Sequence, residues 1–207
     1  LLIVDEVITG FGRTGNWFGS QTYNIKPHIM TIAKGLSSGY QPIGGSIVCD
    51  EIAHVVGNAG DDFNHGYTYS GHPVAAAVAL ENLRILEEEN IIGHVRDVAH
   101  PYLAERWHAL KDHPMVGETN LVGLMGSLVL TPNKETRAKF AGKQGTVGFR
   151  VRERCFKNNL IMRHVYDRMI ISPPLVITPE EIDVLIARAK LSLDEAYKSL
   201  VEEGLFK

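Results

Sequence analysis

Residues 1–15 read LLIVDEVITGFGRTG and contain two patterns that predict different folds. Because the apolar run Leu1–Val4 is continuous, we expect a strand that is buried on both faces of a parallel sheet. Gly10–Gly15 matches G-x-G-x-x-G, a fingerprint of dinucleotide-binding folds. Asp5 and Glu6, between the two, place carboxylates at the end of the strand, so the rest of the chain must decide which pattern carries the chemistry.

The dinucleotide interpretation lacks two of its three requirements. A helix should open at the third glycine and an acidic residue should follow about twenty positions later. The segment after Gly15, NWFGSQTYNIKP, has a further glycine, a proline and no helical period. No Asp or Glu occurs between Glu6 and Asp50. An NAD-dependent enzyme is therefore the weakest of the possible functions.

Composition is that of an ordinary globular chain. The 207 residues are 44% hydrophobic and 22% charged, with a net charge of -3 that gives no reason to expect nucleic acid or a membrane as partner. The cysteines, Cys49 and Cys155, are too few and too far apart for a disulfide framework or a cysteine metal site. This cysteine usage favours a reducing, cytoplasmic location. The histidines lack metal-binding spacing, so we expect no metal site.

The N-terminal part predicts short strands separated by glycine-rich loops, with strands at 1–4, 28–33 and 46–49. Pro73 is in the position of a first helical residue, and the segment PVAAAVALENLRILEEEN that follows it is typical of a helix. A second helical stretch at 92–111 is kinked or divided by Pro101. Because such a strand cannot begin a domain alone, we expect the chain to be the C-terminal part of a longer polypeptide.

The C-terminal part predicts a smaller α+β region. A strand at 121–132, a helix at 146–159 and a strand pair at 160–175 precede a capping box that opens at Thr178. The helix after that box should run to about residue 203. The expected division is therefore 1–90 as part of a large domain, 91–112 as a helical connection and 113–207 as a small domain.

Asp5 and Lys34 are the residues that carry chemistry. Each ends a predicted strand and precedes a glycine-rich loop, and ligands of α/β folds bind beyond the carboxyl ends of strands. Lys34 follows apolar Ile32 and Ala33, and burial there would favour the neutral amine that forms a Schiff base. A lysine for an aldehyde and an acid for a pyridinium nitrogen are what pyridoxal phosphate requires.

Four segments resemble the class III aminotransferases of fold type I, and within them the omega-transaminases that use pyruvate. They are DEVITGFGRTG, IAKGLSSGYQPIGG, GYTYSGHPVAAAVALENL and LIMRHVYDRMIISPPLVIT, which together run through most of the chain. The resemblance implies an α/β fold in which part of the large-domain, mostly parallel sheet precedes a small α+β domain. It also implies a homodimer, or a dimer of dimers, with shared active sites.

The resemblance also implies roles for individual residues. Asp5 would pair with the pyridinium nitrogen, and Val7 would pack on one face of the ring. Lys34 would form the Schiff base and then move a proton. Tyr67 and Thr68 would reach the phosphate of the partner subunit across the dimer interface. The phosphate loop and the residue that stacks on the other ring face would precede residue 1.

Arg163 matches the mobile arginine of the family. It would bind the carboxylate of the keto acid and move aside for an amine without one, whereas Arg168 is expected in a structural ion pair. The implied reaction moves an amino group from an aliphatic amine, diamine, polyamine or omega-amino acid to pyruvate or a similar keto acid.

Three alternatives remain: a decarboxylase or aminomutase of the same fold, a non-catalytic relative, and a truncated, inactive fragment. We expect the isolated 207-residue segment to be inactive.

Overall fold

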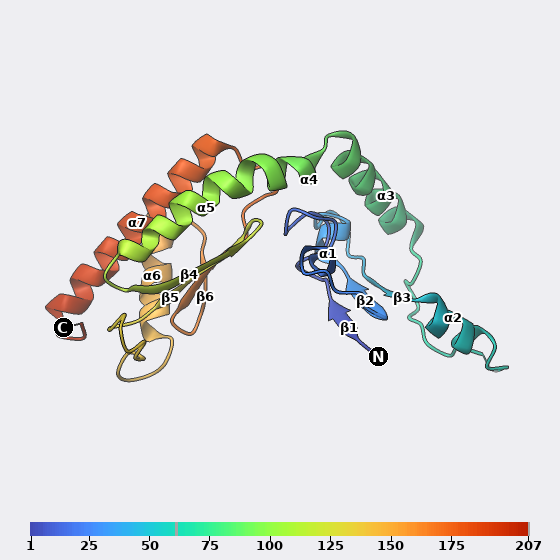
Figure 1. Ribbon diagram of the computed structural model, residues 1–207, viewed down its shortest axis with the longest axis horizontal. Coiled ribbons are helices and arrows are strands. Elements are labelled where there is room, and N and C mark those ends of the chain that lie inside the picture. Colours follow the sequence, from blue (N-terminus) through green and yellow to red (C-terminus); the bar gives the residue numbers. More distant parts are fainter. Residues whose placement is uncertain (61, 207) are drawn as a thin grey trace. The chain divides into compact units, whose positions relative to one another are not determined.

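A computed structural model describes residues 1–60 and 62–206 of the chain (Figure 1). The chain divides into two compact units, Leu1–Arg96 and Asp97–Lys207. Both units combine helices with a small sheet, which agrees with the predicted α/β class. The sequence-based boundaries at residues 90 and 112 stay a prediction.

The first unit contains a three-stranded sheet in the order β1-β2-β3. Strand β1 (Ile3–Asp5) pairs in parallel with β2 (Ile29–Ile32), and β2 pairs in antiparallel fashion with β3 (Gly45–Val48). The parallel register places Asp5 directly opposite Thr31. The three expected strands are therefore confirmed, and the carboxyl ends of β1 and β2 lie at the same edge of the sheet.

The expectation that the first strand is buried on both faces is wrong for the described chain. Leu1 and Ile3 are 87% and 62% exposed, and Asp5 at the end of the strand is exposed too. In the sheet as described, β1 has a neighbouring strand on one side only. Apolar composition predicts what a strand can bury, but burial itself depends on what packs against it.

Five short or medium helices complete the first unit: α1 (Gly19–Thr22), the 3-10 helix η1 (Lys34–Leu36), α2 (Asp50–Gly57), α3 (Pro73–Glu88) and α4 (Ile91–His94). Helix α3 begins at the proline that the sequence indicated and buries Ala75, Ala79 and Leu86. Helix α2 was not predicted: Ile52, Val55 and Val56 follow helical spacing, but the pattern is short and none of the helix residues is buried.

The expected helix at 92–111 is interrupted before Pro101 rather than at it. A π-helical turn, η2 (Val95–Ala99), follows α4, and α5 (His100–Ala109) then begins with Pro101 in its first turn. Proline is tolerated in a first turn because the backbone N–H that it lacks has no helical partner there. Pro101 therefore starts a helix in this structure.

The second unit is an antiparallel sheet with helices on one face. Its strands run in the order β4-β5-β7-β6, with bounds Val116–Val122, Met125–Leu130, Arg168–Ile171 and Arg163–Val165. The single strand expected at 121–132 is instead the end of β4 and all of β5, because Gly123 (φ 54°) allows a tight turn between them. The strand pair expected at 160–175 is confirmed as β6 and β7.

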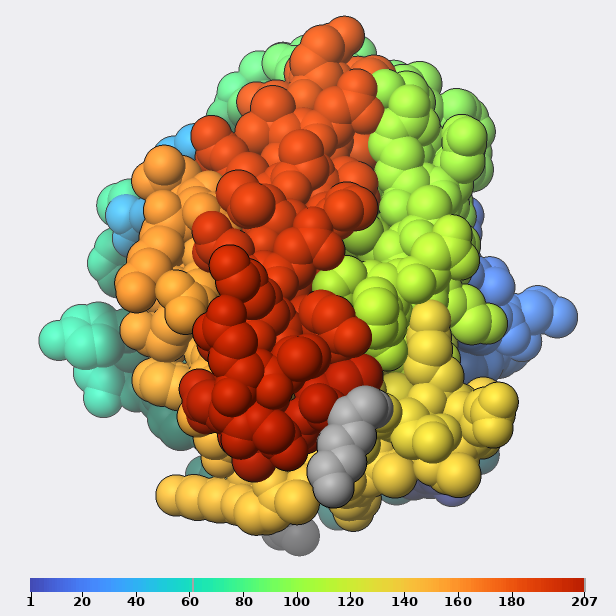
Figure 2. Space-filling view, turned by 90° about the vertical axis from the view of Figure 1, so that its left-hand side faces the viewer, coloured from blue at the N-terminus to red at the C-terminus, as the bar shows by residue number. Residues whose placement is uncertain are grey.

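Three helices build the core of the second unit: α5, α6 (Thr146–Lys157) and α7 (Pro179–Glu202). Helix α7 lies between α5 and α6 and contacts both (Figure 2). Its expected capping box is present, with Thr178 Oγ1 accepting from Glu181 N–H and the Glu181 carboxylate accepting from Thr178 N–H. The core includes Trp107, Leu128, Met169 and Leu193, all essentially without exposure.

Candidate active site

Asp5 presents one carboxylate oxygen to the edge of the sheet. Oδ1 accepts from the backbone N–H of Val7 at 3.0 Å and, more weakly, from the Thr31 hydroxyl at 3.4 Å. Among the described residues, Oδ2 has no hydrogen-bond partner. The carboxylate is thus oriented through one oxygen, while the other can accept a hydrogen bond from a ligand.

Lys34 follows the carboxyl end of β2 as the first residue of η1. It lies three positions after Thr31, the residue opposite Asp5, so the acid and the amine belong to neighbouring parallel strands. The Lys34 side chain is exposed, and among the residues that the structure describes its Nζ has no hydrogen-bond or ion-pair partner. The burial expected from its apolar neighbours is therefore not observed, because β1 to β3 leave this edge of the sheet open.

The backbone of Lys34 is strained. Its φ is 37°, in the left-handed region that residues with a Cβ rarely adopt. Such conformations persist where surrounding contacts impose them, and they concentrate at functional sites. The strained backbone therefore indicates a functional role for Lys34 independently of the chemistry of its amine.

Glu6 holds the turn that follows Asp5, a role that the sequence interpretation missed. Its side chain has no exposed surface, and its carboxylate accepts from Gly19 N–H at 2.8 Å, from Ser20 N–H at 2.6 Å and from the Thr9 hydroxyl. Burial raises the pKa of Glu6, but these hydrogen bonds outweigh burial and lower the pKa overall. Because Glu6 lies 13 and 14 positions before the two backbone N–H groups that it binds, no local sequence signal indicated this anchor.

The glycine pattern of residues 10–15 serves the same turn. A Cβ on Gly10 would lie 2.8 Å from the Glu6 carbonyl oxygen, and Gly12 and Gly15 have φ values of 98° and 85°. The helix that follows, α1, has only four residues. The G-x-G-x-x-G match thus has a conformational explanation, and no long helix opens at its third glycine as a dinucleotide site requires.

Asn82 connects helix α3 to the lysine turn and was also missed. Its Nδ2 donates to the carbonyl oxygens of Gly35 at 2.9 Å and Leu36 at 3.1 Å, and its Oδ1 accepts from the Ser38 hydroxyl at 2.7 Å. The signal was a polar amide within an otherwise alanine- and leucine-rich helix.

The remaining predicted cofactor residues lie in the first unit. Val7 is half-buried next to Asp5. Tyr67 is 76% exposed at the end of a segment without regular secondary structure, and Thr68 begins the exposed turn that precedes α3. The rings of Phe63 and His65 are tilted toward each other with centroids 5.7 Å apart, and those of His65 and Tyr67 meet edge to face at 5.8 Å. The role of Val7 on the cofactor ring and the roles of Tyr67 and Thr68 at the phosphate of a partner subunit stay predictions.

Arg163 lies in the second unit as the first residue of β6. It is exposed and forms no ion pair with a described residue. The ion pair expected for Arg168 is not found among the described residues either. The strand register places both arginines on one face of the sheet, with Arg163 opposite Ile170 and Arg168 opposite Val165.

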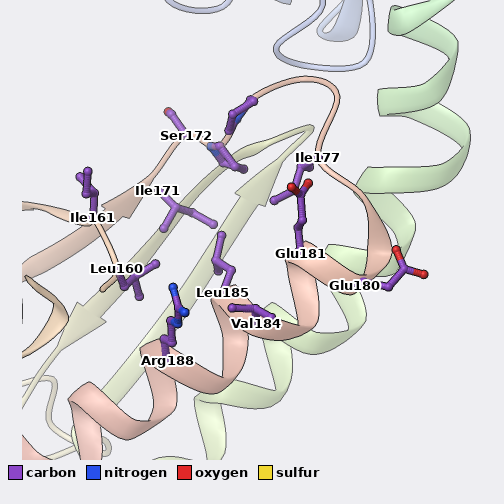
Figure 3. A pocket seen from close by; sticks show the side chains of 12 residues that line it. Leu160, Ile161, Ile171, Ser172, Ile177, Glu180, Glu181, Val184, Leu185 and Arg188 are labelled. Carbon is purple, nitrogen blue, oxygen red and sulfur yellow. The ribbon is translucent and has the colours of Figure 1, made fainter. Parts of the chain in front are cut away.

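A groove of about 560 Å³ in the second unit lies between α7 and the chain that follows β7 (Figure 3). It is mainly apolar, with Leu185 and Val184 from α7 and Ile171 from β7 among its walls. None of the predicted catalytic, cofactor or substrate residues lines it. In residues 1–60 and 62–206, no cluster of three or more metal-ligating side chains and no helix able to cross a membrane is found.

The donor set at the edge of β1 and β2 fits pyridoxal phosphate. The cofactor needs a carboxylate for its ring nitrogen and an amine for its aldehyde. Asp5 and Lys34 supply these groups at the carboxyl ends of adjacent parallel strands, where α/β folds bind ligands. The fold together with this pair of residues defines a partial domain of the fold type I class of pyridoxal-phosphate enzymes.

Comparison with known proteins gives the family within that class. The sequence profile of class III aminotransferases matches residues 1–193, so the chain belongs to this family. The chain is 60% identical over 195 residues to putrescine–pyruvate aminotransferase of Pseudomonas aeruginosa, covering 94% of this chain and 42% of that protein. It is 42% identical to the mitochondrial gamma-aminobutyrate transaminase 1 of Solanum lycopersicum, covering 98% of this chain and 39% of that protein.

Solved structures agree with the sequence comparison. An (S)-enantioselective omega-transaminase from Thermomicrobium roseum superposes with a TM-score of 0.89 at 42% identity, covering 95% of this chain and 44% of that chain. The predicted class III resemblance and the fold type I architecture are thereby confirmed. The chain spans about two fifths of the length of the curated relatives that it matches.

Proposed function

We propose that the polypeptide to which this chain belongs is a pyridoxal-phosphate-dependent aminotransferase. It would transfer an amino group from an aliphatic amine, diamine, polyamine or omega-amino acid to pyruvate or a similar keto acid. The observation that carries the proposal is the placement of Asp5 and Lys34 at the carboxyl ends of adjacent parallel strands. Asp5 Oδ2 and Lys34 Nζ have no hydrogen-bond partner among the residues that the structure describes. Because the chain is 60% identical in sequence to a putrescine–pyruvate aminotransferase, putrescine is the first amino donor to test.

Each residue would have a separate task. Asp5 would hold a proton on the cofactor's ring nitrogen through Oδ2, because Oδ1 is already bound by the Val7 N–H. Pyridoxal phosphate, when bound, supplies an electron sink for the electron pair of a broken substrate Cα–H bond. Lys34 would bind the cofactor covalently through Nζ and, after the substrate amine displaces it, accept and return the substrate proton.

Substrate and partner contacts extend the proposal. Arg163 would bind the carboxylate of the keto acid through its guanidinium, which has no ion pair among the described residues. Tyr67 and Thr68 would contact the phosphate bound by a second subunit of a cytoplasmic homodimer or dimer of dimers. Their exposure in this chain leaves them available for such a contact.

Spectroscopy and product analysis of the full-length protein test the function. The wild type should show the visible absorption band of lysine-bound pyridoxal phosphate, and Lys34→Ala should lack it. With putrescine and pyruvate, each equivalent of amine consumed should yield one equivalent of alanine and one of aldehyde. A decarboxylase would leave putrescine, which has no carboxylate, unconsumed, and would release carbon dioxide only when an amino acid is supplied. A wild type without a Lys34-dependent band would rule the proposal out.

A further inference from the structure

The turn that carries Lys34 is held by a helix distant in sequence. Asn82 lies in α3, 46 and 47 residues from the two carbonyl groups that accept its amide hydrogens. Those carbonyls belong to Gly35 and Leu36, the residues that complete η1 after Lys34. The Asn82 amide thus binds the backbone immediately after the lysine from outside the loop.

Both ends of the Asn82 amide are used. Nδ2 donates both of its hydrogens, and Oδ1 accepts from the Ser38 hydroxyl at 2.7 Å. The donor distances of 2.9 and 3.1 Å lie within the ordinary range. An amide with every strong bond satisfied fixes the position of its partners, because moving any one of them leaves a half-buried polar group unpaired.

The fixed partners lie where the backbone is strained. Lys34 has φ 37° and Ser38 has φ 49°, so left-handed residues flank the segment that Asn82 holds. The other side of the segment is also constrained, since a Cβ on Gly35 would lie 3.0 Å from Phe11 Cβ and 3.2 Å from the Gly10 carbonyl oxygen. A strained conformation persists only where contacts on several sides impose it.

We propose that Asn82 is a positioning residue for Lys34: its amide holds the strained lysine turn so that Nζ is directed toward the ligand held by Asp5. This inference rests on the proposed function, because it assigns Lys34 the role of binding the cofactor. Asn82 itself is assigned no contact with substrate or cofactor. Its contribution is the orientation of the lysine backbone, and it is independent of Arg163 and of the substrate used.

Two substitutions in the full-length protein remove this contribution in different ways. Asn82→Ala removes all three bonds and places a better helix former in α3, so the helix itself is favoured. Asn82→Asp keeps the size and the acceptor for Ser38 but turns an acceptor toward the two carbonyls. Ser38→Ala removes only one bond and should have a smaller effect. Glu81→Ala, at the adjacent exposed position of α3, is the matched control.

The readouts are the dissociation constant of pyridoxal phosphate, the wavelength and pH profile of the visible band, and the melting temperature of the apoprotein. We expect Asn82→Ala and Asn82→Asp to weaken cofactor binding by about tenfold or more and to displace the pH profile. We expect Glu81→Ala to leave both unchanged. A structural role alone would lower the melting temperature without moving the pH profile of the folded, loaded protein.

The outcomes separate this inference from the function on which it rests. If the wild type shows a Lys34-dependent band and both Asn82 variants keep its affinity and pH profile, the positioning role is wrong and the aminotransferase proposal stands. A wild type without that band overturns both. If one Asn82 variant does not fold, the other variant and Ser38→Ala decide by the same readouts, with an unchanged pH profile in each counting against the inference.

Discussion

Replacing Gly148 with alanine sets two effects of opposite sign against each other. Gly148 lies in the first turn of α6, where alanine is intrinsically about 1 kcal/mol more favourable than glycine. A Cβ at this position, however, would lie 2.1 Å from the backbone carbonyl oxygen of Tyr166. Because that atom belongs to the backbone of the turn between β6 and β7, it cannot move aside as a side chain would.

The neighbouring hydrogen bonds increase the expected loss. The Asp167 carboxylate accepts from Gly148 N–H at 2.9 Å and from Gly145 N–H at 3.1 Å, and it caps the start of α6. Moving the helix away from Tyr166 would stretch these bonds, and a hydrogen bond to a charged group contributes roughly 1.5–3 kcal/mol. Overpacking itself costs about 1–3 kcal/mol. Steric strain therefore outweighs helix propensity, and Gly148→Ala should lower the free energy of unfolding by about 2–5 kcal/mol.

Thermal unfolding of the full-length protein, followed by circular dichroism, measures the effect. At about 2–4 °C per kcal/mol, the melting temperature should fall by roughly 4–20 °C. Gly57→Ala is the control, because Gly57 ends α2 with nothing within 4 Å of an added Cβ and should be close to neutral. An unchanged or higher melting temperature for Gly148→Ala would refute the close approach of α6 to this turn.

Three further predictions concern the second unit. Thr178→Ala should lower the free energy of unfolding by about 1 kcal/mol and Thr178→Ser much less, measured by urea denaturation, because the hydroxyl caps α7. Burial lowers the pKa of His113 below its usual 6.5. The unfolded chain therefore binds the proton first, and unfolding free energy should decrease as the pH falls below 6.5 through the folded pKa; His113→Phe should flatten this decrease. Arg163→Ala should raise the KM for pyruvate far more than that for putrescine, with Arg168→Ala as control; equal losses would contradict its assignment.

The sequence allowed prediction of the elements that carry a local signal. The apolar runs, Pro73 and the capping box at Thr178 correctly predicted strands and helices, because each acts through its immediate neighbours in the chain. The positions of Asp5 at the end of β1 and of Lys34 just after β2 were predicted correctly for the same reason. Helix α2 has only a short signal of this kind, with apolar side chains at Ile52, Val55 and Val56, and it was not predicted.

The parts that were not predicted depend on contacts between distant segments. Glu6 and Asn82 are polar residues whose pattern alone is that of solvated side chains. Their roles arise from backbone groups 13 to 47 positions away. Exposure of Ile3 and Lys34 was also misjudged, because burial is a property of everything that surrounds a strand and not of the strand's composition.

The open side of β1 affects how this chain behaves when it is produced by itself. A strand with apolar side chains and unpaired backbone groups is a template for strand addition by other molecules. Leu1, Ile3 and the neighbouring groups offer such a template. The isolated polypeptide should therefore form insoluble assemblies during refolding, and charged or proline substitutions in this strand should improve its recovery.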